Sequence, residues 1–193
     1  MSKNILIING HPAPEKSTAG SEIIRKLSEL LPEAQVRHLA HLTSGGSFDV
    51  AAEQAALRQA DAVVWHFPFY WYSVPALMKK WIDDVLAYGF AYGSSATALH
   101  GKQLLLSLTT GAGADDYQQG ASMTWPLEAF LPPLLQTAYY CGMKTLKPVW
   151  SYSMICIPGV TDAAGRERIL ADARIHAERI AKELRDWERE EQK

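Results

Sequence analysis

The amino-acid sequence predicts an α/β fold with five parallel strands in one doubly wound sheet, covered by helices on both faces in three layers. Short runs rich in β-branched residues alternate with longer segments of helical periodicity, which is typical of βαβ units. No repeat or linker-like stretch divides the 193 residues. With 48% hydrophobic residues the chain can bury one sizeable core. We therefore expect a single domain over residues 1–193.

The predicted strands are short apolar runs, several of which end at glycine or proline. They span residues 4–9, 34–39, 62–67, 103–108 and 147–153. Right-handed crossovers between such strands favour the order 2-1-3-4-5, which is the flavodoxin-like arrangement. Ligands of these sheets bind beyond the carboxyl ends of the strands, so the segments after the first, third and fourth strands are the first places to search.

The predicted helices follow from apolar spacing and from capping residues. Residues 21–31 have helical spacing, and Asp49 can cap a second helix. Pro75 suits the first turn of a third helix. The helix predicted over residues 127–140 contains two adjacent prolines, which should bend it or delay its start. Asp162 can cap a long last helix.

Composition excludes several classes of protein. A net charge of −2 without a basic block gives no footprint for nucleic acid, and it also disfavours an acidic one-electron carrier. No run approaches the roughly 18 apolar residues of a membrane span. Cys141 and Cys156 have neither metal-site nor disulfide-framework spacing, so we expect two buried thiols in a reducing cytoplasm. No metal site is predicted.

The segment after the first strand runs from Gly10 to Ser21 and is rich in small and hydroxyl-bearing residues. Such a segment before a helix can hold a phosphate through free N–H groups and the helix dipole, or it can be a plain N-cap. The Walker pattern and the G-x-G-x-x-G fingerprint are both absent, which disfavours a classical NAD Rossmann site.

The segment after the third strand places four consecutive aromatic residues, 69–72, between two prolines. A planar ligand stacked on them would explain this composition, and so would a dimer interface or an aromatic corner of the core. Residues 109–112 after the fourth strand can offer backbone amides, and Tyr117 offers a phenol to a developing oxyanion, although an ordinary flexible loop is the alternative. Together the three segments indicate a phosphate pocket, an aromatic wall and an amide cradle, which are what FMN requires.

These segments resemble the bacterial NAD(P)H:quinone oxidoreductases of flavodoxin-like fold, relatives of DT-diaphorase, and most closely the ancillary flavoproteins of glutathione-gated potassium-efflux systems. The specific stretches are PFYWYSVP at residues 68–75 and TTG at residues 109–111. The resemblance implies that the phosphate end is held by His11, Ser17, Thr18, Ala19 and Gly20. It implies that the flavin ring is lined by Phe69, Tyr70, Trp71 and Tyr72. It assigns the pyrimidine edge to Thr109, Thr110, Gly111 and Ala112, and the active-site tyrosine to Tyr117.

The resemblance further implies a homodimeric NAD(P)H dehydrogenase (quinone). It would transfer a hydride from NADH or NADPH through FMN, or FAD, to a quinone-like acceptor. The alternative is a flavin-binding regulatory subunit of a glutathione-gated potassium-efflux transporter, held at the inner face of the membrane by that partner. Three departures stand out: Gly20 replaces a frequent Asn, Ala112 replaces a second Gly, and no His follows Tyr117 within a dozen residues.

Compared with DT-diaphorase, the sequence lacks the C-terminal extension that helps to enclose the adenosine of FAD, so the resemblance favours FMN over FAD. The surplus of aromatic residues is consistent with an apolar subunit contact. The residues in question are Trp65, Phe69, Tyr70, Trp125, Phe130, Tyr139 and Tyr140.

Overall fold

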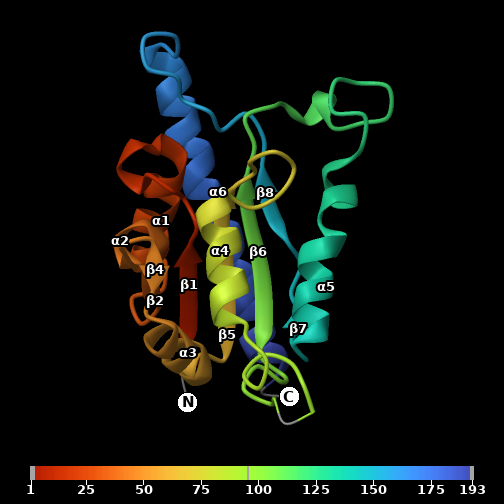
Figure 1. Ribbon diagram of the computed structural model, residues 1–193. Helices are drawn as coiled ribbons and strands as arrows, with labels where there is room; N and C mark the ends of the chain where they lie inside the picture. The colour runs from red at the N-terminus through yellow and green to blue at the C-terminus, as the bar shows by residue number, and fades with distance from the viewer. Residues whose placement is uncertain (1–2, 95, 192–193) are drawn as a thin grey trace.

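The computed structural model describes residues 3–94 and 96–191, and its centre is a parallel β-sheet (Figure 1). The strands are β1 (Ile5–Asn9), β2 (Gln35–His38), β5 (Ala62–Pro68), β6 (Gln103–Thr109), β7 (Lys144–Thr145) and β8 (Val149–Ser151). Their order is β2-β1-β5-β6, with β7 and β8 both pairing with β6. The predicted order 2-1-3-4-5 is therefore confirmed.

The fifth strand differs from the prediction, because it is split into two short pieces. β7 pairs with the start of β6 and β8 with its end. Pro148 lies directly before β8 and has no N–H to donate, so the ladder cannot run on through it.

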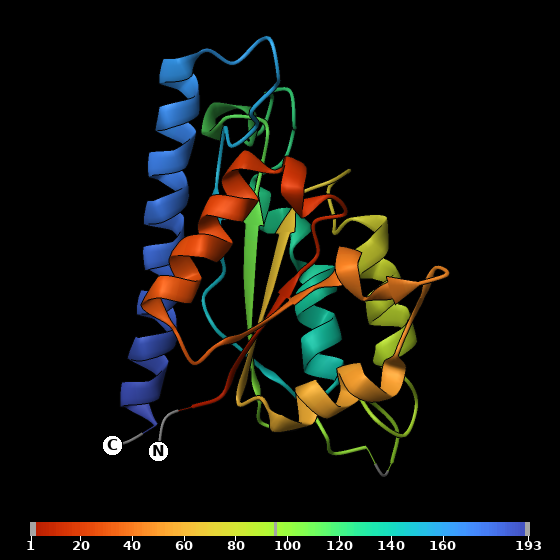
Figure 2. The same cartoon turned by 90° about the vertical axis from the view of Figure 1, so that its left-hand side faces the viewer.

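Five helices longer than eight residues cover the two faces of the sheet among the described residues. They are α1 (Thr18–Leu30), α3 (Val50–Gln59), α4 (Ala76–Val85), α5 (Pro132–Tyr140) and α6 (Ala163–Glu190). Figure 2 shows α1 and α6 side by side on one face, whereas α3, α4 and α5 cover the other. Asp49 and Asp162 cap α3 and α6, as predicted, by accepting hydrogen bonds from the N–H groups three residues on.

Two helix starts differ from the prediction. α1 begins at Thr18 rather than at residue 21, because Ser17 Oγ accepts the N–H of Gly20 at 3.0 Å and caps the helix earlier. Pro75 is the N-cap residue of α4 rather than part of its first turn. The delayed start of α5 is confirmed: a 3₁₀ turn, η3 (Leu127–Phe130), comes first, and the two prolines occupy the first helical positions.

Several short elements were not predicted. They are the 3₁₀ turns η1 (Pro14–Lys16) and η2 (Ala114–Asp116), the single turn α2 (Leu39–Leu42), and the hairpin of β3 (Thr43–Ser44) and β4 (Ser47–Phe48). None of the helices in the part of the chain that the structure describes is long and apolar enough to cross a membrane.

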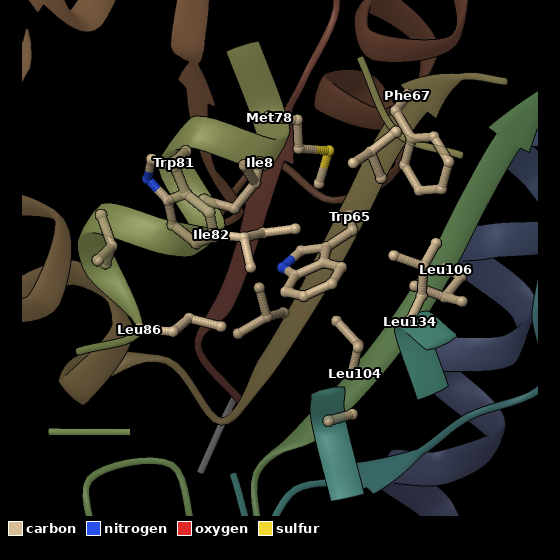
Figure 3. Packing of buried hydrophobic residues seen from close by; sticks show 14 of the residues in the cluster. Ile8, Trp65, Phe67, Met78, Trp81, Ile82, Leu86, Leu104, Leu106 and Leu134 are labelled. Carbon is tan, nitrogen blue, oxygen red and sulfur yellow. The ribbon is translucent and has the colours of Figure 1, made fainter. Parts of the chain in front are cut away.

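Alternate strand residues build two cores on opposite faces of the sheet. In β5, Trp65 and Phe67 face α3, α4 and α5, whereas His66 faces α1 and α6. Figure 3 shows Trp65 surrounded by Met78, Trp81 and aliphatic side chains, and the two indole rings meet edge to face at 6.4 Å. Trp65 is therefore buried in the core, and the expectation that it lies at a subunit contact is wrong.

A buried ion pair ties β2, α3 and α4 together. Both carboxylate oxygens of Glu53 accept hydrogen bonds from Nε of Arg37, at 2.9 and 3.0 Å, and the guanidinium makes a further contact through Nη2. Glu53 Oε2 also accepts the indole N–H of Trp81 at 2.9 Å. The Glu53 and Arg37 side chains are 2% and 16% exposed, so this pair lies inside the apolar face of the sheet.

Candidate functional site

A cavity of about 480 Å³ lies at the carboxyl ends of β1, β5 and β6, the upper edge of the sheet in Figure 1. Its volume is within the range of about 300–1,000 Å³ that is typical of small-molecule sites. Nine of the predicted cofactor residues line it: His11, Ser17, Thr18, Ala19, Phe69, Tyr70, Thr109, Thr110 and Gly111. The cavity thus joins the three segments that the sequence singled out.

The first wall is the start of α1, where the helix presents unpaired backbone donors. The Ser17 cap takes up the N–H of Gly20, but no hydrogen bond within the described residues engages the N–H of Thr18 or Ala19. Lys16 also lines this end of the cavity. Two free amides, the positive end of a helix and a nearby ammonium favour an anion here. Gly20 is buried and does not itself line the cavity.

His11 is fixed by its own loop. Its Nδ1 accepts the N–H of Ala13 at 3.0 Å, so the neutral ring carries its proton on Nε2. The backbone N–H of His11 donates to Asn9 Oδ1 at 3.2 Å. Burial lowers the pKa of His11, and the nearby Glu15 carboxylate only partly opposes this. At neutral pH, His11 is therefore an uncharged donor through Nε2 at the edge of the cavity.

The second wall holds two of the four consecutive aromatic residues. Phe69 and Tyr70 line the cavity, and the Tyr70 ring meets the His11 ring edge on at 6.2 Å. Trp71 and Tyr72 form the tip of the turn with φ values of 46° and 65°, in the left-handed region. Trp71 is 91% exposed, and neither tip residue lines the cavity. The structure thus separates the predicted aromatic wall into two lining rings and two rings at the rim.

The third wall is the turn after β6. Thr110 is held by its N–H, which donates to the Ser151 carbonyl at 3.0 Å, and by its hydroxyl, which donates to the Ala112 carbonyl at 2.8 Å. The N–H groups of Gly111 and Ala112 make no hydrogen bond with any described residue. Ala112 does not line the cavity itself, but this turn presents two adjacent free amides beside it.

Tyr117 lies in an aromatic cluster behind the second wall. Its ring centroid is 6.5 Å from that of Phe69, 6.4 Å from that of Phe130 and 5.5 Å from that of Tyr152. The residue is buried and does not line the cavity. Burial raises the pKa of Tyr117, and so do the neighbouring tyrosines, so its phenol stays protonated at neutral pH.

A fourth wall, which was not predicted from the sequence, is made of Met154, Ile155 and Cys156 after β8. The position of this wall could have been predicted, because in a parallel sheet β8 ends at the same edge as the other strands. The N–H of Met154 donates to the Thr110 carbonyl at 2.8 Å and joins this wall to the third. Cys156 is partly exposed, so the expectation of two buried thiols is correct only for Cys141. Pro12, Ala13, Lys16 and Pro68 complete the lining.

Comparison with known proteins identifies the family. A family model described as "flavodoxin-like fold" matches residues 3–179. The chain belongs to the flavodoxin-like fold family. It is 41% identical over 184 residues to the glutathione-regulated potassium-efflux system ancillary protein KefF of Klebsiella pneumoniae (strain 342), covering 95% of this chain and 96% of that protein.

Two solved structures are similar to the chain over most of its length. General stress protein 14 of Treponema denticola, in complex with FMN, has a TM-score of 0.79 and 32% identity over 91% of this chain and 95% of that one. An NADPH-quinone reductase from P. pentosaceus has a TM-score of 0.72 and 26% identity over 91% and 98% of the two chains.

Proposed function

We propose that this flavodoxin-like chain binds FMN in the cavity and catalyses two-electron transfer from NAD(P)H to a quinone-like acceptor. The observation that carries the proposal is the pairing of free amides across one cavity with aromatic walls, with Thr18 and Ala19 on one side and Gly111 on the other. This donor set fits a ligand with a phosphate at one end and a planar ring with acceptors at the other. The FMN complex of general stress protein 14 and the quinone reductase of P. pentosaceus support the same assignment.

Bound FMN would supply the hydride chemistry, accepting two electrons and passing them on. The first turn of α1 would hold the phosphate through the N–H groups of Thr18 and Ala19. Phe69 and Tyr70 would orient the ring, and His11 would donate through Nε2. Each of the three loops is held by backbone hydrogen bonds of its own.

Charge stabilisation would come from the third wall. The N–H groups of Gly111 and Ala112 would lie at the pyrimidine edge, where preorganised amides stabilise developing negative charge. Tyr117, whose pKa is raised by burial, would remain a proton-bearing donor toward the acceptor. The sequence has no His within the dozen residues after Tyr117, so this tyrosine would act without a histidine relay.

Two further parts of the proposal concern partners. A second copy of the chain would cover exposed aromatic side chains, among them Trp71 and Trp125, which are both largely exposed. The similarity to KefF also favours a second function, as the flavin-binding regulatory partner of a potassium-efflux transporter. Both functions use the same cavity, so they do not exclude each other.

The decisive experiment is to purify the chain, release any bound cofactor by heat and weigh it by mass spectrometry. We expect the mass of FMN, and a mass of FAD would correct the cofactor. Anaerobic addition of NADPH should then bleach the yellow protein, and a quinone should restore its colour. A protein that stays colourless after incubation with excess FMN would refute the proposal. Co-purification with the transporter tests the second function, and its absence would reject that function.

A further inference from the structure

A chain of four hydrogen-bonded side chains connects β5, β6 and β8 with α6. His66 Nδ1 lies 2.8 Å from Ser107 Oγ, and the same oxygen lies 2.9 Å from His176 Nε2. His176 Nδ1 lies 2.8 Å from Ser151 Oγ. The chain therefore runs from β5 through β6 to α6 and on to β8, entirely on the face covered by α1 and α6. The mechanism above uses none of these four residues.

The free end of this chain is aimed at the start of α1. His66 is 1% exposed, and a Cβ added to Gly20 would lie 3.6 Å from its Nε2. Among the described residues, none forms a hydrogen bond with this nitrogen. Gly20 belongs to the helix turn that presents the free N–H groups of Thr18 and Ala19. A ring nitrogen of a buried histidine, without a hydrogen-bond partner among the described residues, thus lies next to the same helix end that is suited to an anion.

The order of protons along the chain is restricted. Burial lowers the pKa of His66 to about 3 and that of His176 well below its ordinary value, so both rings are neutral at pH 7. Ser107 has a single hydroxyl proton, so it donates to one ring and accepts from the other. Consequently both rings carry their proton on Nδ1, or both carry it on Nε2.

We propose that His66 is a ligand of the phosphate monoester end of the flavin and that the anion fixes both rings of the chain in the Nε2-protonated form. In that order, His66 donates through Nε2 toward the first turn of α1. The opposite order would place a lone pair against the anion. Ser107, His176 and Ser151 are positioning residues, which hold the proton order from the other end of the hydrogen-bonded chain. This inference rests on the proposed function.

The first test compares the affinities for FMN and riboflavin, which differ only in the phosphate. In His66→Asn, the shorter amide can still bond Ser107 but leaves the position of Nε2 empty. In His66→Gln, the longer amide restores a donor there. We expect His66→Asn to weaken FMN binding by about ten- to a hundredfold and to leave riboflavin binding unchanged. We expect His66→Gln to recover most of the lost FMN affinity.

The second test needs no variant and therefore holds even if His66→Asn fails to fold. In the FMN complex of the wild-type chain labelled with ¹⁵N-histidine, NMR should show protonated Nε2 and bare Nδ1 for His66 and His176. A protonated Nδ1 in either ring overturns the inference. So does an FMN-to-riboflavin affinity ratio that His66→Asn leaves unchanged. If wild-type chain binds neither flavin, the proposed function fails first, and the two failures are thereby distinguished.

Discussion

The buried ion pair makes a strong prediction for the stability of the α3/α4 face. In Glu53→Gln the side-chain volume and an acceptor for Trp81 remain, but the Arg37 guanidinium, whose side chain is only 16% exposed, loses its counter-charge. Breaking one partner of a buried pair costs about 3–5 kcal/mol. For a chain of this length, about 2–4 °C of melting temperature is lost per kcal/mol, so we expect a decrease of roughly 6–20 °C.

Urea unfolding followed by circular dichroism measures this change in the free energy of unfolding. The matched control is Asp83→Asn, which breaks the ion pair between Asp83 and Lys79. The side chains of Asp83 and Lys79 are 57% and 60% exposed. That change should cost less than about 0.5 kcal/mol. Adding Arg37→Met to Glu53→Gln should recover most of the loss, because no buried charge remains and the glutamine still accepts the indole N–H of Trp81. A loss below about 1 kcal/mol in Glu53→Gln would refute the reasoning.

Three further predictions follow from the site and its surroundings. The free energy of unfolding should fall as the pH drops below about 6.5, by up to about 1.4 kcal/mol per pH unit for each of His66 and His176. The reason is that the unfolded chain binds protons on these rings that the folded chain binds only at much lower pH. Urea titrations at several pH values measure this change, and an unchanged stability between pH 7 and 5 would contradict it. Tyr117→Phe should lower quinone turnover by about a hundredfold with FMN affinity unchanged, as stopped-flow and binding titrations would show, and full turnover would remove the phenol from the mechanism. Gly10→Ala would place a Cβ 2.5 Å from Met78 Sδ and 3.0 Å from its Cβ, so we expect a loss of about 1–3 kcal/mol by urea unfolding, and wild-type stability would disprove the steric argument.

The elements that could be predicted from the sequence are those set by local chemistry. Buried parallel strands are continuous apolar runs, and Asp49 and Asp162 are caps whose side chains act within three residues. The hairpin at residues 43–48 and the single turn at residues 39–42 were missed, because such short elements form only through contacts with the rest of the fold. The break before β8 could have been predicted from Pro148.

At the candidate site, the sequence locates a loop where a strand end fixes its position, but it does not give the direction of the side chains in that loop. Phe69 and Trp71 are two residues apart, yet one lines the cavity and the other points to solvent, because the chain turns between them. Tyr117 follows the turn at residues 109–112 closely in the sequence, but in the fold it is buried among three aromatic neighbours. Only the folded chain reveals that His66 lies under Gly20, because these residues come from separate elements.

The left-handed conformation of Trp71 and Tyr72 has a consequence for association. Bulky residues with positive φ cost about 1–3 kcal/mol each, so a free peptide of this sequence would seldom adopt this turn. Within the protein, the backbone bridge between Tyr70 and Ser73 closes the turn and holds both residues in place. A surface that covers Trp71 therefore meets an indole on an already ordered backbone, and binding loses little further conformational entropy there.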